Sequence, residues 1–397
     1  MKKIMVIAGG AWQKPITRKA KDMGLYVISS NLYEDSPAFE YADECYVANV
    51  LDKERNLEIA KKVMPDAVIT DQSDIAVPTV AYVCEQMGLR GIGTDKASLF
   101  TNKYLMRDFC CKNGFPDIKY RLCSDINEAV DFYEQYGKSI IKPLDSQSSR
   151  GVYIINSVED IMKNFEDTRS YSNSACKVLI EQYIEGTEFT VDGVKTPDDH
   201  VVLAISEKTH FEHNPSIAKG LFFSNKNDRF DYDKLRKLNS DLVNAMELPY
   251  GLTHAEYKYM NGEFYLIEIA ARGGGTRISS DIVPIMSGVD HNKLLIEMAL
   301  GKSVTVERDI DMERCAVLNF LNFRNGRVKK INGLDEAKAL PGVVEIMLDF
   351  EEGDTIKEPS DDRSRQGFYI AYADNKENME SLCKKIEATV EVDYYEC

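Results

Sequence analysis

Hydrophobic and polar residues along the first hundred positions follow the pattern of short strands that lead into amphipathic helices. Apolar runs such as KIMVIAGG and DAVIT precede helical patterns, namely WQKPITRKAKDMG, DKERNLEIAKKVM and VPTVAYVCEQMG. This alternation predicts a doubly wound parallel sheet. Ligands of such a sheet bind at the carboxyl ends of its strands, here at residues 9–11 and 70–74.

A glycine pair, Gly9 and Gly10, follows the first predicted strand. The G-x-G-x-x-G fingerprint of dinucleotide-binding domains is absent. A tight turn between strand and helix is therefore favoured over phosphate binding. We predict that residues 1–95 form one α/β domain.

The pattern changes after residue 95. One long amphipathic helix is predicted from Asp95, its cap, to Gly114. A second helix leads to the apolar strand KSIIKPL, after which come the polar loop DSQSSRGV and the segment KVLIEQYIEGTEFTVDGV, which has the pattern of two strands about a turn. The last ninety or so residues have the pattern of a small α+β module.

Two glutamates on a predicted hairpin form the candidate metal site. Glu268 and Arg272 share one face of the strand in FYLIEIAARGGG, and Glu256 lies on the strand before it. Asn261-Gly262 is a strong hairpin signal. A three-residue loop, 261–263, places Glu256 opposite Glu268, whereas a two-residue loop would put the two carboxylates on opposite faces.

Facing carboxylates repel each other, and a hard divalent cation bound through oxygen removes that cost. The alternative is a solvated hairpin face with unrelated charges. Arg272 favours the cation, because a cation and a guanidinium beside a glycine-rich turn suit a transferring phosphoryl group. His254 is predicted to be structural rather than a ligand, because magnesium prefers oxygen.

A lysine and a serine-rich loop form the candidate phosphate site. Lys142 ends an apolar strand, and the loop after it contains Ser148 and Ser149. Hydroxyls and backbone amides of a loop can close over phosphates, while a lysine supplies a point charge. A lysine that reaches solvent from a strand end is an equally good interpretation. Further along, the carboxylates of Glu181 and Glu188 flank a glycine turn suited to adenine and ribose.

The segment SEKTHFEHNPSIAKGLFFSN is polar and aromatic, with little strand pattern. We expect it to line or cover a substrate pocket, with Glu207, Lys208 and His210 near the reaction; a plain surface loop is the alternative. Gly274 would allow a close approach of substrate. Arg277 could bind a substrate carboxylate or equally cap the next helix.

Composition narrows the class of protein. The 397 residues are 44% hydrophobic and 29% charged, as in soluble proteins of two or three domains. A net charge of −16 argues against a nucleic-acid surface, and no apolar run is long enough for a membrane span or a signal peptide. Nine cysteines without a C-x-x-C pair indicate neither a zinc site nor a disulfide framework. We therefore expect a cytoplasmic protein.

Five motifs in order resemble the ATP-grasp superfamily: NKYLMRDF, IIKPLDSQSSRGV, LIEQYIEGTEFTVDG, THAEYKY and LIEIAAR. The sequence is most similar to L-amino-acid ligases and related amide-forming enzymes, whose hairpin ends in a similar EIAAR and glycines. Residues 1–95 resemble the domain that precedes the ATP-grasp fold in carbamoyl-phosphate-synthetase-like ligases. The resemblance implies an ATP-grasp domain at 96–305, two α+β subdomains that sandwich ATP, with a mobile lid at about 139–192, and a C-terminal domain at 306–397.

The resemblance also implies roles for individual residues. Phosphates of ATP would contact Lys103, Lys142 and the serine loop, and the nucleoside would be held by Glu181, the backbone of Gln182 and Ile184, and Glu188. Glu256 and Glu268 would bind one or two Mg²⁺ ions, or Mn²⁺. Arg272 would stabilise the phosphoryl group and the tetrahedral intermediate. Many members carry asparagine where this chain has Ala270, so the second metal has less support.

The implied reaction joins a small-molecule carboxylate to an amine. ATP phosphorylates the carboxylate, and the amine attacks the acyl phosphate, which releases ADP and phosphate. Two alternatives stay open: a carbamoyl-phosphate-type or purine-pathway ligase, and a degenerate ATP-binding regulatory protein, against which the retained Lys142, Glu256, Glu268 and Arg272 argue. The oligomeric state is open, although a homodimer is common among such proteins.

Overall fold

The N-terminal part of the chain is a parallel α/β layer. The computed structural model describes residues 1–144, 150–172, 176–308, 313–361 and 363–395. Four parallel strands lie in the order β3-β2-β1-β4, with bounds Glu44–Val47, Tyr26–Asn31, Lys3–Ile7 and Ala67–Ile69. Successive residues of β1 point to opposite faces, so Ile4 packs toward helix α1 (Lys14–Asp22) and Met5 toward α2 (Lys53–Val63) and α3 (Val77–Met87). The doubly wound sheet is confirmed.

Two helices, rather than one, connect this layer to the rest of the chain. They are α4 (Thr94–Leu99) and α5 (Lys103–Lys112), so the prediction of a continuous helix is wrong. The side chain of Asn102 accepts hydrogen bonds from the amides of Tyr104 and Leu105 and caps α5. Lys103 consequently stands at the first position of α5, at its amino end.

A small antiparallel sheet follows. Its order is β5-β8-β6-β7, with bounds Tyr120–Cys123, Val178–Gln182, Ser139–Pro143 and Tyr153–Ile155. Helices α6 (Ile126–Tyr136) and α7 (Val158–Ser170) share an apolar core with one face of the sheet. This lobe therefore begins at β5 and ends with β8, earlier at both ends than the expected boundaries of about 139 and 192.

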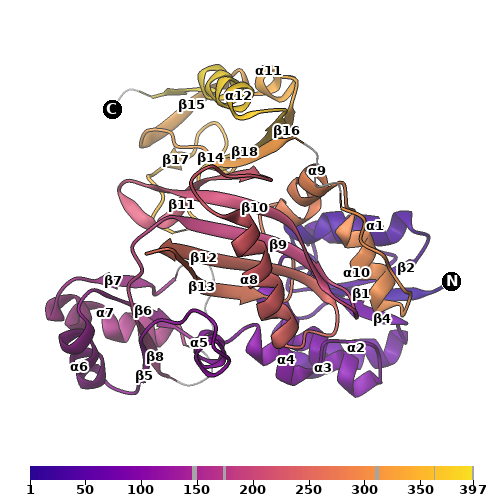
Figure 1. Ribbon diagram of the computed structural model, residues 1–397. Coiled ribbons are helices and arrows are strands. Elements are labelled where there is room, and N and C mark those ends of the chain that lie inside the picture. Colours follow the sequence, from indigo (N-terminus) through magenta and orange to yellow (C-terminus); the bar gives the residue numbers. More distant parts are fainter. Residues whose placement is uncertain (145–149, 173–175, 309–312, 362, 396–397) are drawn as a thin grey trace.

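A single eight-stranded sheet forms the centre of the molecule (Figure 1). Its order is β13-β12-β9-β10-β11-β14-β18-β16, and the bounds in chain order are β9 Glu188–Lys195, β10 His200–Phe211, β11 Asn214–Ser224, β12 Gly251–Met260, β13 Glu263–Ala270, β14 Cys315–Phe320, β16 Val343–Leu348 and β18 Gly367–Ala373. Helix α8 (Tyr232–Ala245) covers one face. The segment with little strand pattern is the hairpin β10-β11, so the surface-loop alternative is wrong.

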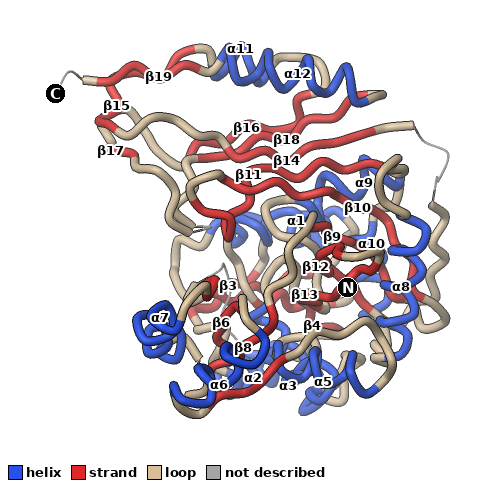
Figure 2. The backbone as a smooth tube through the Cα atoms, turned by 60° about the vertical axis from the view of Figure 1, so that its left-hand side comes forward, coloured by secondary structure: helices blue, strands red, loops and turns tan. Residues whose placement is uncertain are grey.

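The C-terminal module is continuous with this sheet, because β14, β16 and β18 extend it. Figure 2 shows the module above strands β9 to β13, with α11 (Leu334–Lys338) and α12 (Lys376–Thr389) on its outer side. A separate three-stranded sheet has the order β17-β15-β19, with bounds Thr355–Ile356, Gly326–Asn332 and Glu391–Tyr394. Helices α9 (Val283–Ser287) and α10 (His291–Ala299) connect the large sheet to the N-terminal layer.

The helices of the described ranges include none that is long and apolar enough to cross a membrane.

A buried histidine predicts acid sensitivity of the fold. The ring of His200 is 3% exposed and contacts the hydroxyls of Thr253 and Ser240 at 2.8 and 3.1 Å. Burial lowers its pKa from 6.5 to about 3. Since the unfolded chain binds this proton first, stability is expected to fall as pH drops below 6.5, by about 1.4 kcal/mol per pH unit.

Urea unfolding of wild type and His200→Gln between pH 7 and 5 measures this effect. The variant should show a shallower loss of stability with acid. The exposed His213→Gln serves as the control and should follow the wild type. Parallel curves for wild type and His200→Gln would contradict the assignment.

Candidate active site

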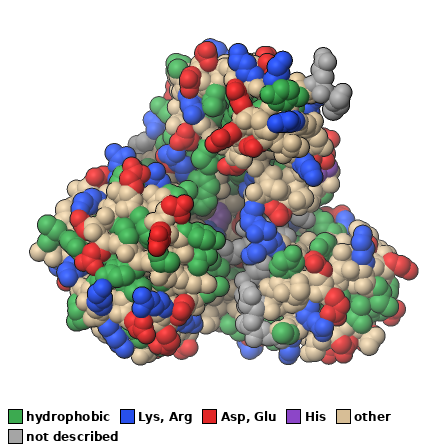
Figure 3. Space-filling view, turned by 180° about the vertical axis from the view of Figure 1, so that it is seen from behind, with side chains coloured by type: hydrophobic (Ala, Val, Ile, Leu, Met, Phe, Trp, Pro, Cys, Tyr) green, Lys and Arg blue, Asp and Glu red, His purple; other side chains and the backbone are tan. Residues whose placement is uncertain are grey.

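A cavity of about 710 Å³ opens between the small sheet, the large sheet and the C-terminal strands. In Figure 3 the molecule is hollowed where these parts meet the N-terminal layer, with Lys and Arg side chains beside the opening. Most of the predicted site residues line it: Lys103, Lys142, Glu181, Gln182, Ile184, Glu188, Lys208, His210, Glu256, Glu268 and Arg272. Elements from all three parts of the chain therefore build one site.

One end of the cavity is suited to a flat heterocycle. Ile140 and Ile154 of the small sheet and Ile267 of β13 all line it, close to the linker 182–184. The amides of Gln182 and Tyr183 donate to the carbonyls of Lys119 and Lys138. Within the described ranges the amide of Ile184 donates to no protein acceptor. An apolar slot beside an available backbone amide is the arrangement that recognises a purine edge.

A buried ion triad lies behind this slot. The Glu181 carboxylate, 1% exposed, accepts from Lys142 Nζ at 2.7 Å and from Arg107 Nε at 2.8 Å. Burial by itself would raise the pKa of Glu181, but the two cations outweigh it and hold the pKa at about 2. Burial lowers the pKa of Lys142. The Glu181 side chain is thus committed to cations and is not turned toward a nucleobase.

Arg107 is a site residue that the motif analysis missed. Its guanidinium also donates to the carbonyl of Ile267 at 2.5 Å, so one side chain connects α5, β8 and β13. The available signal was its position four residues after Lys103 in NKYLMRDF, on the same face of a helix.

The two glutamates face each other, although the loop is not the expected one. β12 pairs Glu256 directly with Glu268, yet the turn is the two-residue Asn261-Gly262, with both residues at positive φ. The prediction of a three-residue loop is therefore wrong. The pairing is restored by a β-bulge, since the register shifts between Glu256 and Tyr257 and leaves Ile267 as the extra residue of β13.

The bulge also changes which side chains face the cavity. Phe264, Leu266 and Ile269 pack in the core under α8, whereas Ile267 and Glu268, although adjacent, both line the cavity. Strict alternation would have sent one of them into the core. The bulge thus supplies both an apolar wall for the heterocycle and a carboxylate for the cation.

Lysines neutralise the acidic pair. Lys103 Nζ lies 2.9 Å from Glu268 Oε1, and Lys208 Nζ lies 3.0 Å from Glu256 Oε1 and 2.6 Å from Glu188 Oε1. Burial opposes the charged forms, but the Lys208 ammonium outweighs it and lowers the pKa of Glu188 to about 2 and that of Glu256 well below its usual range. Positive charge therefore stabilises the two facing carboxylates of the acidic pair.

A divalent cation fits this donor set. Two facing carboxylates supply hard oxygen ligands, and Mg²⁺ usually takes the others from phosphates and water. The ring of His254 is held by Asp192 rather than by the acidic pair. Its Nδ1 lies 2.9 Å from Asp192 Oδ1, whereas its Nε2 comes no closer to Glu256 than 3.9 Å. Burial would lower its pKa, but Asp192 raises it to about 9. A protonated imidazole is no metal ligand, in agreement with the structural role predicted for it.

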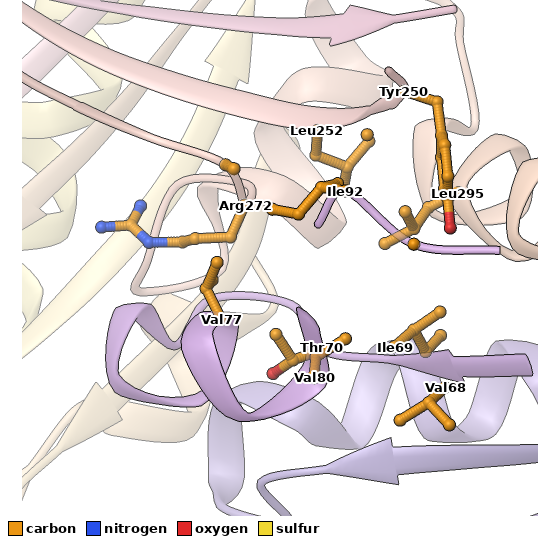
Figure 4. A pocket seen from close by; sticks show the side chains of 13 residues that line it. Val68, Ile69, Thr70, Val77, Val80, Ile92, Tyr250, Leu252, Arg272 and Leu295 are labelled. Carbon is orange, nitrogen blue, oxygen red and sulfur yellow. The ribbon is translucent and has the colours of Figure 1, made fainter. Parts of the chain in front are cut away.

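Arg272 is positioned by the N-terminal layer. Asp74 accepts from its Nε and Nη2 at 2.8 and 2.7 Å, and Asp71 accepts from the amide of Gly273 at 2.9 Å. Both aspartates lie in the loop after β4, the predicted ligand edge. Figure 4 shows the guanidinium pointing away from a small apolar cavity of about 40 Å³ beside Tyr250 and Leu252. The aliphatic stem is packed, and the guanidinium, held by Asp74, lines the larger cavity.

Three predicted substrate residues do not line the cavity. Glu207 lies on the opposite face of β10 from Lys208 and bonds with Arg229 and Asn227. Arg277 pairs with Asp281 and Glu345, so its charge is already satisfied. Gly274 packs against Asp192, whose Oδ1 accepts its amide at 3.1 Å. Ser148 and Ser149 lie outside the described residues.

Comparison with known proteins agrees with this geometry. Residues 137–281 match the model of the ATP-grasp domain. The chain therefore contains an ATP-grasp domain, as the five motifs indicated. Residues 319–395 match the model of L-amino acid ligase C-terminal domain 2, so the module that extends the central sheet is of that kind.

Individual relatives agree in both sequence and fold. The L-arginine-specific L-amino acid ligase of Bacillus subtilis is 25% identical over 383 residues, which cover 91% of this chain and 90% of that protein. The formate-dependent phosphoribosylglycinamide formyltransferase of Wolinella succinogenes is 28% identical but matches only 46% of this chain and 48% of its own length. The crystal structure of an L-amino acid ligase from Bacillus licheniformis superposes with a TM-score of 0.86 at 21% identity, covering 100% of this chain and 99% of that one.

Proposed function

We propose that the protein is an ATP-dependent carboxylate–amine ligase that forms an amide through an acyl phosphate and releases ADP and phosphate. The observation that carries the proposal is a single cavity in which a purine slot, an acidic pair and Arg272 follow one another. Phosphates placed between slot and acidic pair would meet Lys103 and Lys142. This is the set of positions that phosphoryl transfer from ATP to a carboxylate requires.

The chain's own groups have distinct tasks in this reaction. Lys142 and Lys103 would bind phosphate oxygens and orient the γ-phosphoryl group. Arg272, held by Asp74, would stabilise negative charge on that group and on the later tetrahedral oxygen. Mg²⁺ at Glu256 and Glu268 would supply charge neutralisation of the phosphates. A solved relative, the biotin carboxylase domain of a Hydrogenobacter thermophilus carboxylase, was crystallised with MgADP, which supports both cofactors.

A purine-pathway ligase is the second candidate, because formyltransferases of that class match about half of the chain. The C-terminal module favours the first candidate, since its strands enclose the far end of the cavity. The same proposal places the enzyme in the cytoplasm as a homodimer. In support, every cysteine of the described residues is a free thiol, and the biotin carboxylase relative is described as a dimer.

The experiment that tests the function is ADP and phosphate release from Mg-ATP across a panel of amino acids and other carboxylic acids, with hydroxylamine present. We expect acid-dependent ADP release with formation of a hydroxamate, because hydroxylamine traps an acyl phosphate. Release of AMP would overturn the mechanism. Nucleotide binding without turnover on any acid would favour the regulatory alternative.

A further inference from the structure

The cavity continues beyond the reacting groups into a part that the ATP-grasp motifs do not account for. Lys208, Leu221 and Leu318 are register neighbours on the adjacent strands β10, β11 and β14. Because neighbouring strands lie about 4.8 Å apart, Leu318 lies roughly 10 Å from Lys208 along the same sheet face. That span leaves room for a second small substrate beside the reacting groups. We call this part, lined by Trp12, Leu221, Leu318, Phe320, Arg365 and Phe368, the C-terminal wing.

The wall of the C-terminal wing is apolar. Leu221, Leu318, Phe320 and Phe368 belong to the main core cluster and are at most 7% exposed, and Trp12 packs edge-on against Phe368 with ring centroids 5.9 Å apart. Such a surface pairs favourably with an apolar side chain, since each buried methylene contributes about 0.8 kcal/mol.

A guanidinium lies on this wall. The Cζ atom of Arg365 is 3.6 Å from the ring centroid of Phe320, and the side chain also donates to the carbonyl of Ala218. Stacking fixes the plane of the guanidinium, and a fixed fork of N–H donors is the preferred partner of a carboxylate. Arg363 and Asp349 line the same cavity, and the charge of Arg365 partly offsets the burial that raises the pKa of Asp349.

Amide formation between two amino acids leaves the carboxylate of the amine donor unreacted. A site for that partner needs a cation beyond the acyl phosphate, with a surface for its side chain next to the cation. We propose, on the basis of the proposed ligase function, that the C-terminal wing binds the amine substrate as an amino acid with an apolar side chain, whose carboxylate pairs with Arg365.

Hydroxylamine separates this inference from the ligase function itself. It replaces the amine, so hydroxamate formation needs the acyl donor and ATP but not the amine site. In Arg365→Ala, the KM for an apolar amino acid as the amine should rise about 10-fold or more, the effect of losing one charge-assisted hydrogen bond. Hydroxamate formation should stay within twofold of wild type, which also shows that the variant is folded. Arg365→Lys should recover part of the loss.

Arg324→Ala is the matched control. Arg324 also stacks on an aromatic ring of the C-terminal module, 3.9 Å from the centroid of Tyr394, but it does not line the cavity. Wild type should also prefer leucine to 3-methylbutylamine, the same amine without its carboxylate, and Arg365→Ala should lose that preference. Leucine, methionine and phenylalanine should be better amines than aspartate or lysine.

Three results would overturn the inference. One is an unchanged KM for the amine in Arg365→Ala. Another is equal loss of amide and hydroxamate formation in Arg365→Ala and Arg365→Lys, which would place the residue on the acyl side or in folding. The third is indifference of the wild type to the amine's carboxylate. Failure of wild type to form any hydroxamate would instead refute the ligase function.

Discussion

Glu268→Gln is expected to lower the rate of ADP release about 100-fold or more while part of the nucleotide binding remains. The amide keeps the shape of the side chain but removes one of two facing carboxylates, so the site holds a divalent cation weakly. The purine slot, built by Ile140, Ile154 and Ile267, is unaffected. Turnover and fluorescent-nucleotide binding, measured on the same preparation, test both halves of the expectation.

Glu263→Gln is the control for this substitution. Glu263 begins the same strand, but its carboxylate pairs with Lys234 at the surface, 46% exposed, and does not line the cavity. Its removal should leave turnover unchanged. Unchanged turnover in Glu268→Gln would show that the facing glutamate pair is not part of the active site.

Lys142→Met is expected to abolish activity without lowering the stability of the fold. The triad of Arg107, Glu181 and Lys142 holds two buried cations for one carboxylate. Removal of Lys142 leaves a neutral Arg107–Glu181 pair, whereas Glu181→Gln leaves two like charges and should cost about 3–5 kcal/mol. Burial lowers the pKa of Lys142 because it disfavours the charged ammonium. We therefore expect this charge to serve phosphate binding rather than stability.

Thermal unfolding and ATP turnover of the two variants, side by side, measure the contrast. The Tm of Lys142→Met should be at least that of wild type, and that of Glu181→Gln clearly lower. Lys138→Met, which removes an exposed lysine paired with Glu185 next to the same strand, should change neither quantity. A large loss of stability in Lys142→Met would show that the lysine has a structural role.

Much of the site could be read from local sequence because its chemistry lies in short motifs. Local motifs assign Lys142 at a strand end, Glu188 after a glycine turn and the Glu256–Glu268 pair to the site, and all of them line the cavity. The predictions that are wrong concern residues whose position depends on which face of a strand points into the cavity. Glu207 alternates with Lys208 on β10, and nothing local in a segment with little strand pattern fixes that face.

The sequence alone determined the order of elements, the α/β and α+β division and the identity of the reacting groups, because periodicity and motif spacing are local properties. Tertiary structure alone decided how those groups meet. In a hairpin with a two-residue turn, the bulge at Ile267 shifts the register so that Glu256 and Glu268 face each other. The side chain of Arg107 connects three distant elements. Asp74 positions Arg272 across 198 residues. Packing and electrostatics between distant segments fix these contacts, and no local pattern encodes them.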